Sequence, residues 1–274
     1  MIDSILLATD GSEAAISAER MAVALASRLS ARLRAVSVVE EKIVASLRAP
    51  GLDMPPLSPV EGVEAFLKAK ADAACRRFTE RARAAGLDAA SESVQGVADD
   101  VIVQRGGEAD LIVIGRDGEH RGLRTALIGS TADAVIRKTS RSVLVVPEGA
   151  ELGGGLLLAF DGSAGSRVAV RIAVELGGKL REPSHLFVDS KDKGRSVARF
   201  DEVRRLLGQL PVPGRETSST LGRPDVKIVD TARSLRVGLI VMGAYGRNRI
   251  TEFFLGSNAA AVVRTSPVAV LLAR

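Results

Sequence analysis

The chain has 274 residues, of which 46% are hydrophobic, so it is long enough for two domains with substantial apolar cores. Its 3% aromatic content and its lack of Trp argue against a stacking platform for single-stranded nucleic acid. The formal net charge is +5, but residues 1–150 carry 19 Lys or Arg against 21 Asp or Glu, whereas residues 151–274 carry 19 against 12. No basic recognition motif accompanies this excess, so we expect affinity for small polyanions rather than for nucleic acid.

Cys75 is the only cysteine, which excludes an internal disulfide and a cysteine-based metal cluster. It lies in a helical pattern, where we expect a packing residue, and a single cysteine suits a cytoplasmic protein. Asp3 and Asp10 interrupt any signal-peptide core, and no apolar run approaches the roughly 18 to 20 residues that span a bilayer. The sequence therefore predicts no membrane partner.

Strands and helices alternate through the first half of the chain, which is typical of a parallel α/β sheet. A helix is expected from Glu13 to about Leu33, because apolar residues recur there at helical spacing. A long charged helix is expected from Val60 to about Ala85, with Gly86 at its C-cap. The other expected elements are strands at 4–9, 34–39, 87–94, 110–114 and 142–146, helices at 98–106 and 130–138, and a proline-rich irregular segment at 48–59.

The second half of the chain repeats the first. Residues 156–163 repeat 5–12 at an offset of 151, and residues 239–243 repeat 111–115 at an offset of 128. Blocks that match in order indicate an internal duplication. We therefore predict a first domain at 1–147, a glycine-rich linker at 148–155 and a second domain at 156–274. The second copy is 23 residues shorter between these blocks (151 minus 128), so it lacks the proline-rich segment and has a shorter second helix, near 200–210.

The clearest candidate site is the glycine-rich stretch 243–257, which lies between an apolar run at 239–242 and a helical pattern at 258–264. A strand, a glycine loop and a helix N-terminus in this order suit a phosphate, because glycines allow close approach and the first N–H groups of the helix point at the anion. The alternative is a tight strand-to-helix crossover in which the glycines serve the turn alone.

Two motifs now resemble a known family. A first strand that ends in Asp-Gly-Ser, and Gly-x2-Gly-x9-Gly-Ser after the fourth strand, are similar to the universal stress protein family, in two tandem copies that cover the whole chain. The resemblance implies in each copy a five-stranded parallel sheet of order 3-2-1-4-5 with helices on both faces. Ligands in such sheets bind beyond the carboxyl ends of the strands where the order reverses, here between the first and fourth strands.

The resemblance also implies ATP as the ligand, with Mg²⁺ as a potential companion of its phosphates. In this interpretation the first-strand Asp serves the adenosine end, backbone after the second strand meets adenine, and the glycines and serine hold the phosphates. An Asx turn is an alternative, structural role for Asp161. The expected contacts are Asp10, Val39, Gly115, Gly118, Gly129, Ser130 and Thr131 in the first half, and Asp161, Val188, Gly243, Gly246, Arg247, Gly256, Ser257 and Asn258 in the second.

We expect the second-half site to be the stronger of the two. It has the full x9 spacing, and Arg247 beside Gly246 can donate to phosphate, whereas the first-half loop has ten intervening residues and includes Asp117. Neither a Walker A motif nor a Rossmann glycine motif is present in the sequence, and no general base is positioned for attack on a γ-phosphate. We therefore expect a nucleotide-dependent stress-response or sensing module with slow ATP hydrolysis at most. An adenylyl-transferring enzyme and a non-binding scaffold are the alternatives.

The fifth strand of each copy, at 142–146 and 268–272, is an apolar edge, and exposed apolar edges promote association. We expect the two strands to pair within the chain and form a pseudo-dimer. A further homodimer is left open by the sequence.

Overall fold

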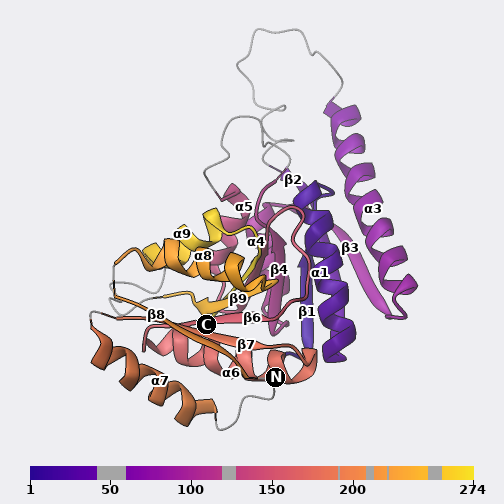
Figure 1. The fold of residues 1–274 in the computed structure, drawn as a ribbon. Coiled ribbons are helices and arrows are strands. Elements are labelled where there is room, and N and C mark those ends of the chain that lie inside the picture. The colour runs from indigo at the N-terminus through magenta and orange to yellow at the C-terminus, as the bar shows by residue number, and fades with distance from the viewer. Residues whose placement is uncertain (42–59, 119–127, 191, 208–212, 221, 246–254) are drawn as a thin grey trace, which may run out of the picture.

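The computed structural model describes residues 1–41, 60–118, 128–190, 192–207, 213–220, 222–245 and 255–274. The proline-rich segment at 48–59, and the predicted site residues Gly246 and Arg247, lie outside these ranges. Within the described ranges, ten strands form one continuous sheet (Figure 1), in the order β3-β2-β1-β4-β5-β10-β9-β6-β7-β8.

Each half of the chain contributes five strands and four described helices. The first half supplies β1 (Ser4–Ala8), α1 (Glu13–Leu29), β2 (Arg32–Glu40), α3 (Val60–Ala84), β3 (Ala89–Gly96), α4 (Ala98–Gly106), β4 (Leu111–Gly115), α5 (Ser130–Lys138) and β5 (Ser142–Val146). The second half supplies β6 (Leu156–Phe160), α6 (Ala164–Leu180), β7 (Ser184–Asp189), α7 (Lys193–Leu207), β8 (Pro213–Ser219), α8 (Pro224–Leu235), β9 (Leu239–Gly243), α9 (Ser257–Thr265) and β10 (Ala269–Ala273).

The strand pairings are parallel within each half. Ala8 on β1 lies between Val36 on β2 and Ile114 on β4, so the carboxyl ends of these three strands meet at one edge of the sheet. In the second half Ala159 on β6 lies in the same way between Phe187 and Met242. The predicted α/β fold in two tandem copies is confirmed, and the order reverses between β1 and β4 and between β6 and β9.

The two halves join through their fifth strands. β5 and β10 pair antiparallel, with Leu144 opposite Leu271 at the centre of the pairing. Both strands are buried throughout, because each covers the apolar edge of the other. The expected intrachain pairing is therefore present.

Helices cover both faces of the sheet and enclose two apolar layers. Buried side chains of α1, α3, α6 and α7 pack on one face, and those of α4, α5, α8 and α9 pack on the other. The burial of the strands on both faces explains why most of them are near-continuous apolar runs in the sequence. Cys75 on α3 is buried and free, as expected of a packing residue.

Two predicted helix boundaries were wrong. The first helix ends at Leu29 rather than Leu33, because Ser30 adopts a left-handed conformation (φ 56°) and the N–H of Ala31 donates back to the carbonyl of Ala26. The second helix of the second half begins at Lys193 rather than near Phe200. The Asp192 carboxylate accepts a hydrogen bond from the Arg195 N–H at 2.8 Å, and this contact starts the helix earlier.

Candidate functional site

A cavity of about 600 Å³ opens at the carboxyl ends of β1 and β4, where the strand order of the first half reverses. This volume lies within the usual range for small-molecule sites. Six of the seven first-half residues predicted to contact nucleotide line it, namely Asp10, Gly115, Gly118, Gly129, Ser130 and Thr131. Val39 is not among the lining residues; β2 contributes Val36, Ser37, Val38 and Glu40 in its place.

A second cavity lies at the corresponding place in the other half, but its volume is only about 130 Å³. Asp161, Gly243, Gly256, Ser257 and Asn258 line it, as predicted, whereas Val188 does not. The order of the two volumes is opposite to the expected ranking of the sites.

Two differences in sequence account for the smaller volume. Phe187 stands at the register position that Val36 occupies in the first half, so a larger side chain fills the floor. The first cavity also has a wall from α3, made by Leu67, Lys70 and Ala71, and α7 supplies no such residue among the described lining of the second. The longer segment of the first half thus supplies part of the cavity wall.

The Asp-Gly-Ser blocks form the same turn in both halves. A carboxylate oxygen of Asp10 accepts a hydrogen bond from the Ser12 N–H at 2.9 Å, and Asp161 accepts from the Ser163 N–H at the same distance. These are Asx turns, so the structural role considered for Asp161 is present. The other oxygen of Asp10 faces the loop after β4, because a methyl group built on Gly118 would lie 3.7 Å from it.

The first glycine of each loop is needed for packing. A Cβ on Gly115 would lie 2.9 Å from the backbone of Ala14 and Ala15, and a Cβ on Gly243 would lie 2.7 Å from the backbone of Gly165 and Ser166. The end of β4 could not approach α1 this closely, nor the end of β9 α6, with any other residue. For Gly115 and Gly243, close packing alone explains the glycine.

The helices that follow the loops begin without a side-chain cap. Ser12 caps α1 and Ser163 caps α6, but the N-cap residues of α5 and α9 are Gly129 and Gly256, neither of which has a side chain to accept from the first turn. The N–H of Gly129 donates to the Arg116 carbonyl at 2.8 Å and closes the loop. The next N–H groups, at the start of α5, have no intrahelical acceptor and line the cavity, which is the arrangement that binds anions.

Charges near the first cavity are largely paired. Asp117, which we expected to repel phosphate, forms an ion pair with Arg116 at 3.1 Å, and both side chains are mostly buried. The Glu40 carboxylate accepts from the Ala98 N–H at the start of α4, at 3.3 Å. Lys70 adds a cation from α3. The acidic residues are thus engaged by their own neighbours, and the N-terminus of α5 and Lys70 favour an anion.

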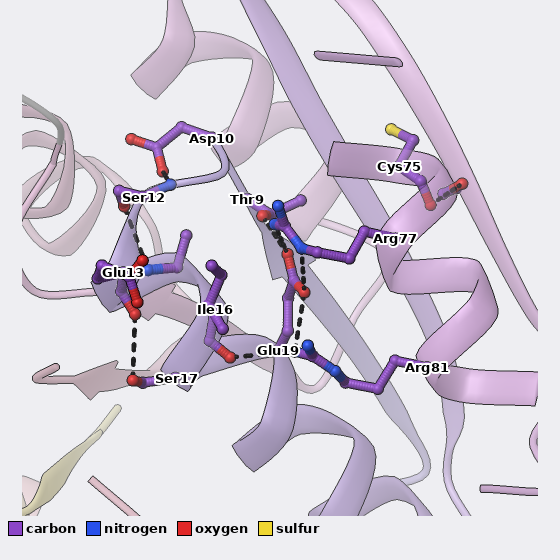
Figure 2. A network of polar contacts seen from close by, with 12 residues as sticks. Thr9, Asp10, Ser12, Glu13, Ile16, Ser17, Glu19, Cys75, Arg77 and Arg81 are labelled. Carbon is purple, nitrogen blue, oxygen red and sulfur yellow. Dashed lines mark hydrogen bonds and ion pairs between the residues drawn. The ribbon is translucent and has the colours of Figure 1, made fainter. Parts of the chain in front are cut away.

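A buried polar network supports the floor of the first cavity (Figure 2). Thr9, which lines the cavity, donates to the Glu19 carboxylate at 2.7 Å, and Glu19 is fully buried in α1. Arg77 and Arg81, both on α3, bind the same carboxylate, Arg81 at 3.0 Å. The network therefore fixes α3, and with it Lys70, against α1. At an offset of 151, the second half has Phe160 and Val170 in place of Thr9 and Glu19.

The second cavity has a different electrostatic character. One Asp189 carboxylate oxygen is buried there without a hydrogen-bond partner, and burial raises the pKa of this side chain. Tyr245 also lines this cavity, and its ring stacks on the Arg274 guanidinium, 4.6 Å from the ring centroid. The Nδ1 atom of His185 accepts from the Arg215 N–H at 2.9 Å, which gives this histidine a structural role.

Several lining residues were missed by sequence reasoning. Thr9 and Ser12 lie inside the repeated block, and their closeness to Asp10 in the sequence could have marked them as lining residues. Leu67 and Lys70 lie on a long charged helix and carried no signal, because only the fold brings α3 to the cavity. Among the described residues, no cluster of three or more His, Cys, Asp or Glu side chains could hold a metal ion. No helix in the described ranges is long and apolar enough to cross a membrane.

Comparison with known proteins identifies the family to which this chain is similar. The model of the universal stress protein family matches residues 1–147 and again 155–274. A universal stress protein of Synechocystis (Slr1230) is 26% identical over 99% of both chains. One from Methanocaldococcus jannaschii (MJ0531) is 31% identical over 144 residues, which are 52% of this chain and 80% of that one.

The fold has a counterpart among solved structures. The crystal structure of a universal stress protein from Archaeoglobus fulgidus superposes with a TM-score of 0.77 at 20% identity, and it covers 100% of this chain and 99% of its own. At this identity the likeness establishes the tandem architecture alone.

Proposed function

The chain belongs to the universal stress protein family, and from this premise we propose that it binds ATP in the cavity of its first half. The observation that carries the proposal is the uncapped N-terminus of α5 at one end of a cavity of about 600 Å³. The adenosine would lie against Val36, Val38 and Leu67, which form an apolar wall, and the phosphates would face Ser130 and the N–H groups that follow it.

The first cavity is the better candidate, against our expectation from the sequence. The second cavity, at about 130 Å³, is smaller than sites that hold nucleotide-sized ligands, and Asp189 places a carboxylate in it. The x9 spacing and Arg247, which favoured the second half, are features of a loop that lies outside the described residues. We therefore infer one nucleotide per chain.

Binding without rapid turnover is the activity that the first cavity supports. Each acidic side chain in its described lining has a structural partner: Asp10 holds the Ser12 turn, Asp117 pairs with Arg116 and Glu40 binds the start of α4. A general base needs an uncommitted carboxylate or imidazole near the attacking water. We propose a nucleotide-dependent stress-response module with slow hydrolysis at most, in which Mg²⁺ would enter with the triphosphate. A cytoplasmic location and a further homodimer stay predictions.

Equilibrium dialysis of the purified chain against ATP, with mass spectrometry of any co-purified nucleotide, tests this proposal. We expect one equivalent of ATP per chain. A chain that arrives empty and takes up no added ATP would favour the non-binding scaffold. Two equivalents would show that both cavities bind and that our assignment to the first half is wrong.

A further inference from the structure

The helices α5 and α9 each begin at the cavity of their own half and end against an arginine of the other half. The first residues of α5 line the first cavity and its last carbonyls lie at the far end; α9 has its first residues in the second cavity. Each has nine residues, so each is about 13 Å long. The last four carbonyls of a helix lack intrahelical partners, and the donors that bind these carbonyls hold that end of the helix in place.

An arginine that contacts the second cavity's wall holds the end of α5. The two terminal nitrogens of Arg274 donate to the carbonyls of Ile136 and Thr139. Arg274 follows β10, in the second half, and its guanidinium stacks on the ring of Tyr245, which lines the second cavity. Arg274 is half-buried, so the contact is partly shielded from water. A cation at this end of a helix is favourable for both its carbonyls and its dipole.

The reverse contact holds the end of α9. Arg116, in the wall of the first cavity, donates to the Ser266 carbonyl at 2.8 Å and to the Arg264 carbonyl at 3.4 Å. The same guanidinium pairs with Asp117, also in that wall. Each helix therefore begins in the cavity of its own half and ends on an arginine of the other half: Arg116 lines the first cavity, and Arg274 contacts Tyr245 in the wall of the second.

These two contacts are not a by-product of the internal repeat. Arg116 corresponds to Ala244 in the second half, at the offset of 128. Arg274 follows the last strand, and the residue that corresponds to it in the first half is Pro147, because the register places Ala273 where Val146 lies in the first half. Non-equivalent residues thus make the same kind of contact in both directions.

We propose that Tyr245 and Arg274 are positioning residues for the first cavity and couple it to the occupancy of the second. A group that enters the second cavity contacts Tyr245, shifts the stacked guanidinium and releases the end of α5. The anion-binding end of α5 then loses its fixed place, so ATP binds more weakly in the first cavity. Linkage is reciprocal, so ATP in the first cavity disfavours a ligand in the second to the same degree. The affinity part of this inference rests on the proposed function; the mechanical link does not.

The full-length chain carrying Tyr245→Ala tests the link, with Tyr245→Phe as the matched control that keeps the ring. The first measurement is amide hydrogen exchange of residues 130–138 without nucleotide, followed by mass spectrometry. We expect faster exchange in the last turn of α5 for Tyr245→Ala and a smaller increase for Tyr245→Phe, which keeps the stacked ring and loses only the hydroxyl that bonds Arg274. The second measurement is the Kd for ATP, which we expect to rise about fivefold in Tyr245→Ala.

The two measurements separate the two proposals. If the wild-type chain binds no ATP, the proposed function fails and the exchange of α5 alone decides the link. If α5 exchanges at the same rate in Tyr245→Ala as in the wild type, the link is overturned, whatever the Kd. Faster exchange with an unchanged Kd would overturn the coupling to binding. Should Tyr245→Ala not fold, Arg274→Gln replaces it with the same expected results, because it removes the charge and keeps much of the side-chain length.

Discussion

Glu19 is the residue on which the shape of the first cavity depends most. Its side chain is fully buried and takes hydrogen bonds from Thr9, Arg77 and Arg81, which offset the cost of burying this polar group. The arginine side chains keep about a third and a quarter of their exposure, so solvent would partly accommodate them without Glu19.

We predict that Glu19→Ala lowers the free energy of unfolding by about 2–3 kcal/mol, because it leaves two arginines facing an apolar floor. Urea denaturation measures the change. Glu108→Ala is the control, since Glu108 pairs with Arg34 on the surface and its loss is expected to cost under about 1 kcal/mol. Equal effects of the two substitutions would show that the buried network has no special role.

At this scale the sequence predicted the position of the site well and the roles within it less well. Asp10 and Gly118 face each other at the predicted edge, because the repeat marked both strand ends. The packing role of Gly115 depends on how closely α1 passes β4, a distance that no sequence pattern encodes. The same limit applies to Val39: alternation along β2 and the placement of neighbouring helices decide which residues reach the cavity.

Among the elements, α3 distinguishes the two halves. It spans 25 residues, against 15 in α7, and its first turns bring Leu67 and Lys70 to the cavity. The offsets located this difference in the sequence, but they gave no reason to assign it to binding. Whether an insertion builds a wall depends on the direction in which the helix leaves the sheet, and here the Glu19 network sets that direction.

Lys70→Ala is predicted to weaken ATP binding about tenfold, because it removes a cation from the wall of a cavity that would hold a polyanion. Isothermal titration calorimetry measures the Kd. Lys68→Ala, two residues earlier on the exposed side of α3, has the same loss of charge and is expected to bind as the wild type. If both variants lost affinity alike, the effect would be one of overall charge, and α3 would not be a wall of the site.

Helix boundaries were the least predictable property of the elements. The apolar spacing that predicts α1 continues into β2, because Ala31 and Leu33 would be buried in a longer helix and are also buried beyond its observed end. Only the left-handed conformation of Ser30 ends the helix. The sequence gives no sign that this serine adopts a left-handed conformation. After α3, by contrast, a glycine marks the helix end, and Gly86 was correctly predicted to end the helix (φ 74°).

At the scale of the whole molecule, the duplication and the antiparallel β5–β10 pairing place the two cavities on opposite edges of one sheet. The apolar fifth strands made this pairing predictable, because each would otherwise leave an open edge. The difference in volume and charge between the two cavities was not predictable. It arises from Phe187, Asp189 and the wall from α3, and these residues act through their size and burial, which no sequence motif records.

The most direct measurement of the central claim compares ATP binding by Ser130→Asp and Ser257→Asp. Both residues are exposed at the first position of an uncapped helix, α5 or α9, where an acidic side chain favours the helix dipole and should leave folding intact. An aspartate in the first cavity would repel the phosphates. We predict that Ser130→Asp weakens ATP binding at least about tenfold while Ser257→Asp keeps the wild-type Kd. Wild-type affinity in Ser130→Asp, or a loss confined to Ser257→Asp, would contradict the assignment of ATP to the first cavity.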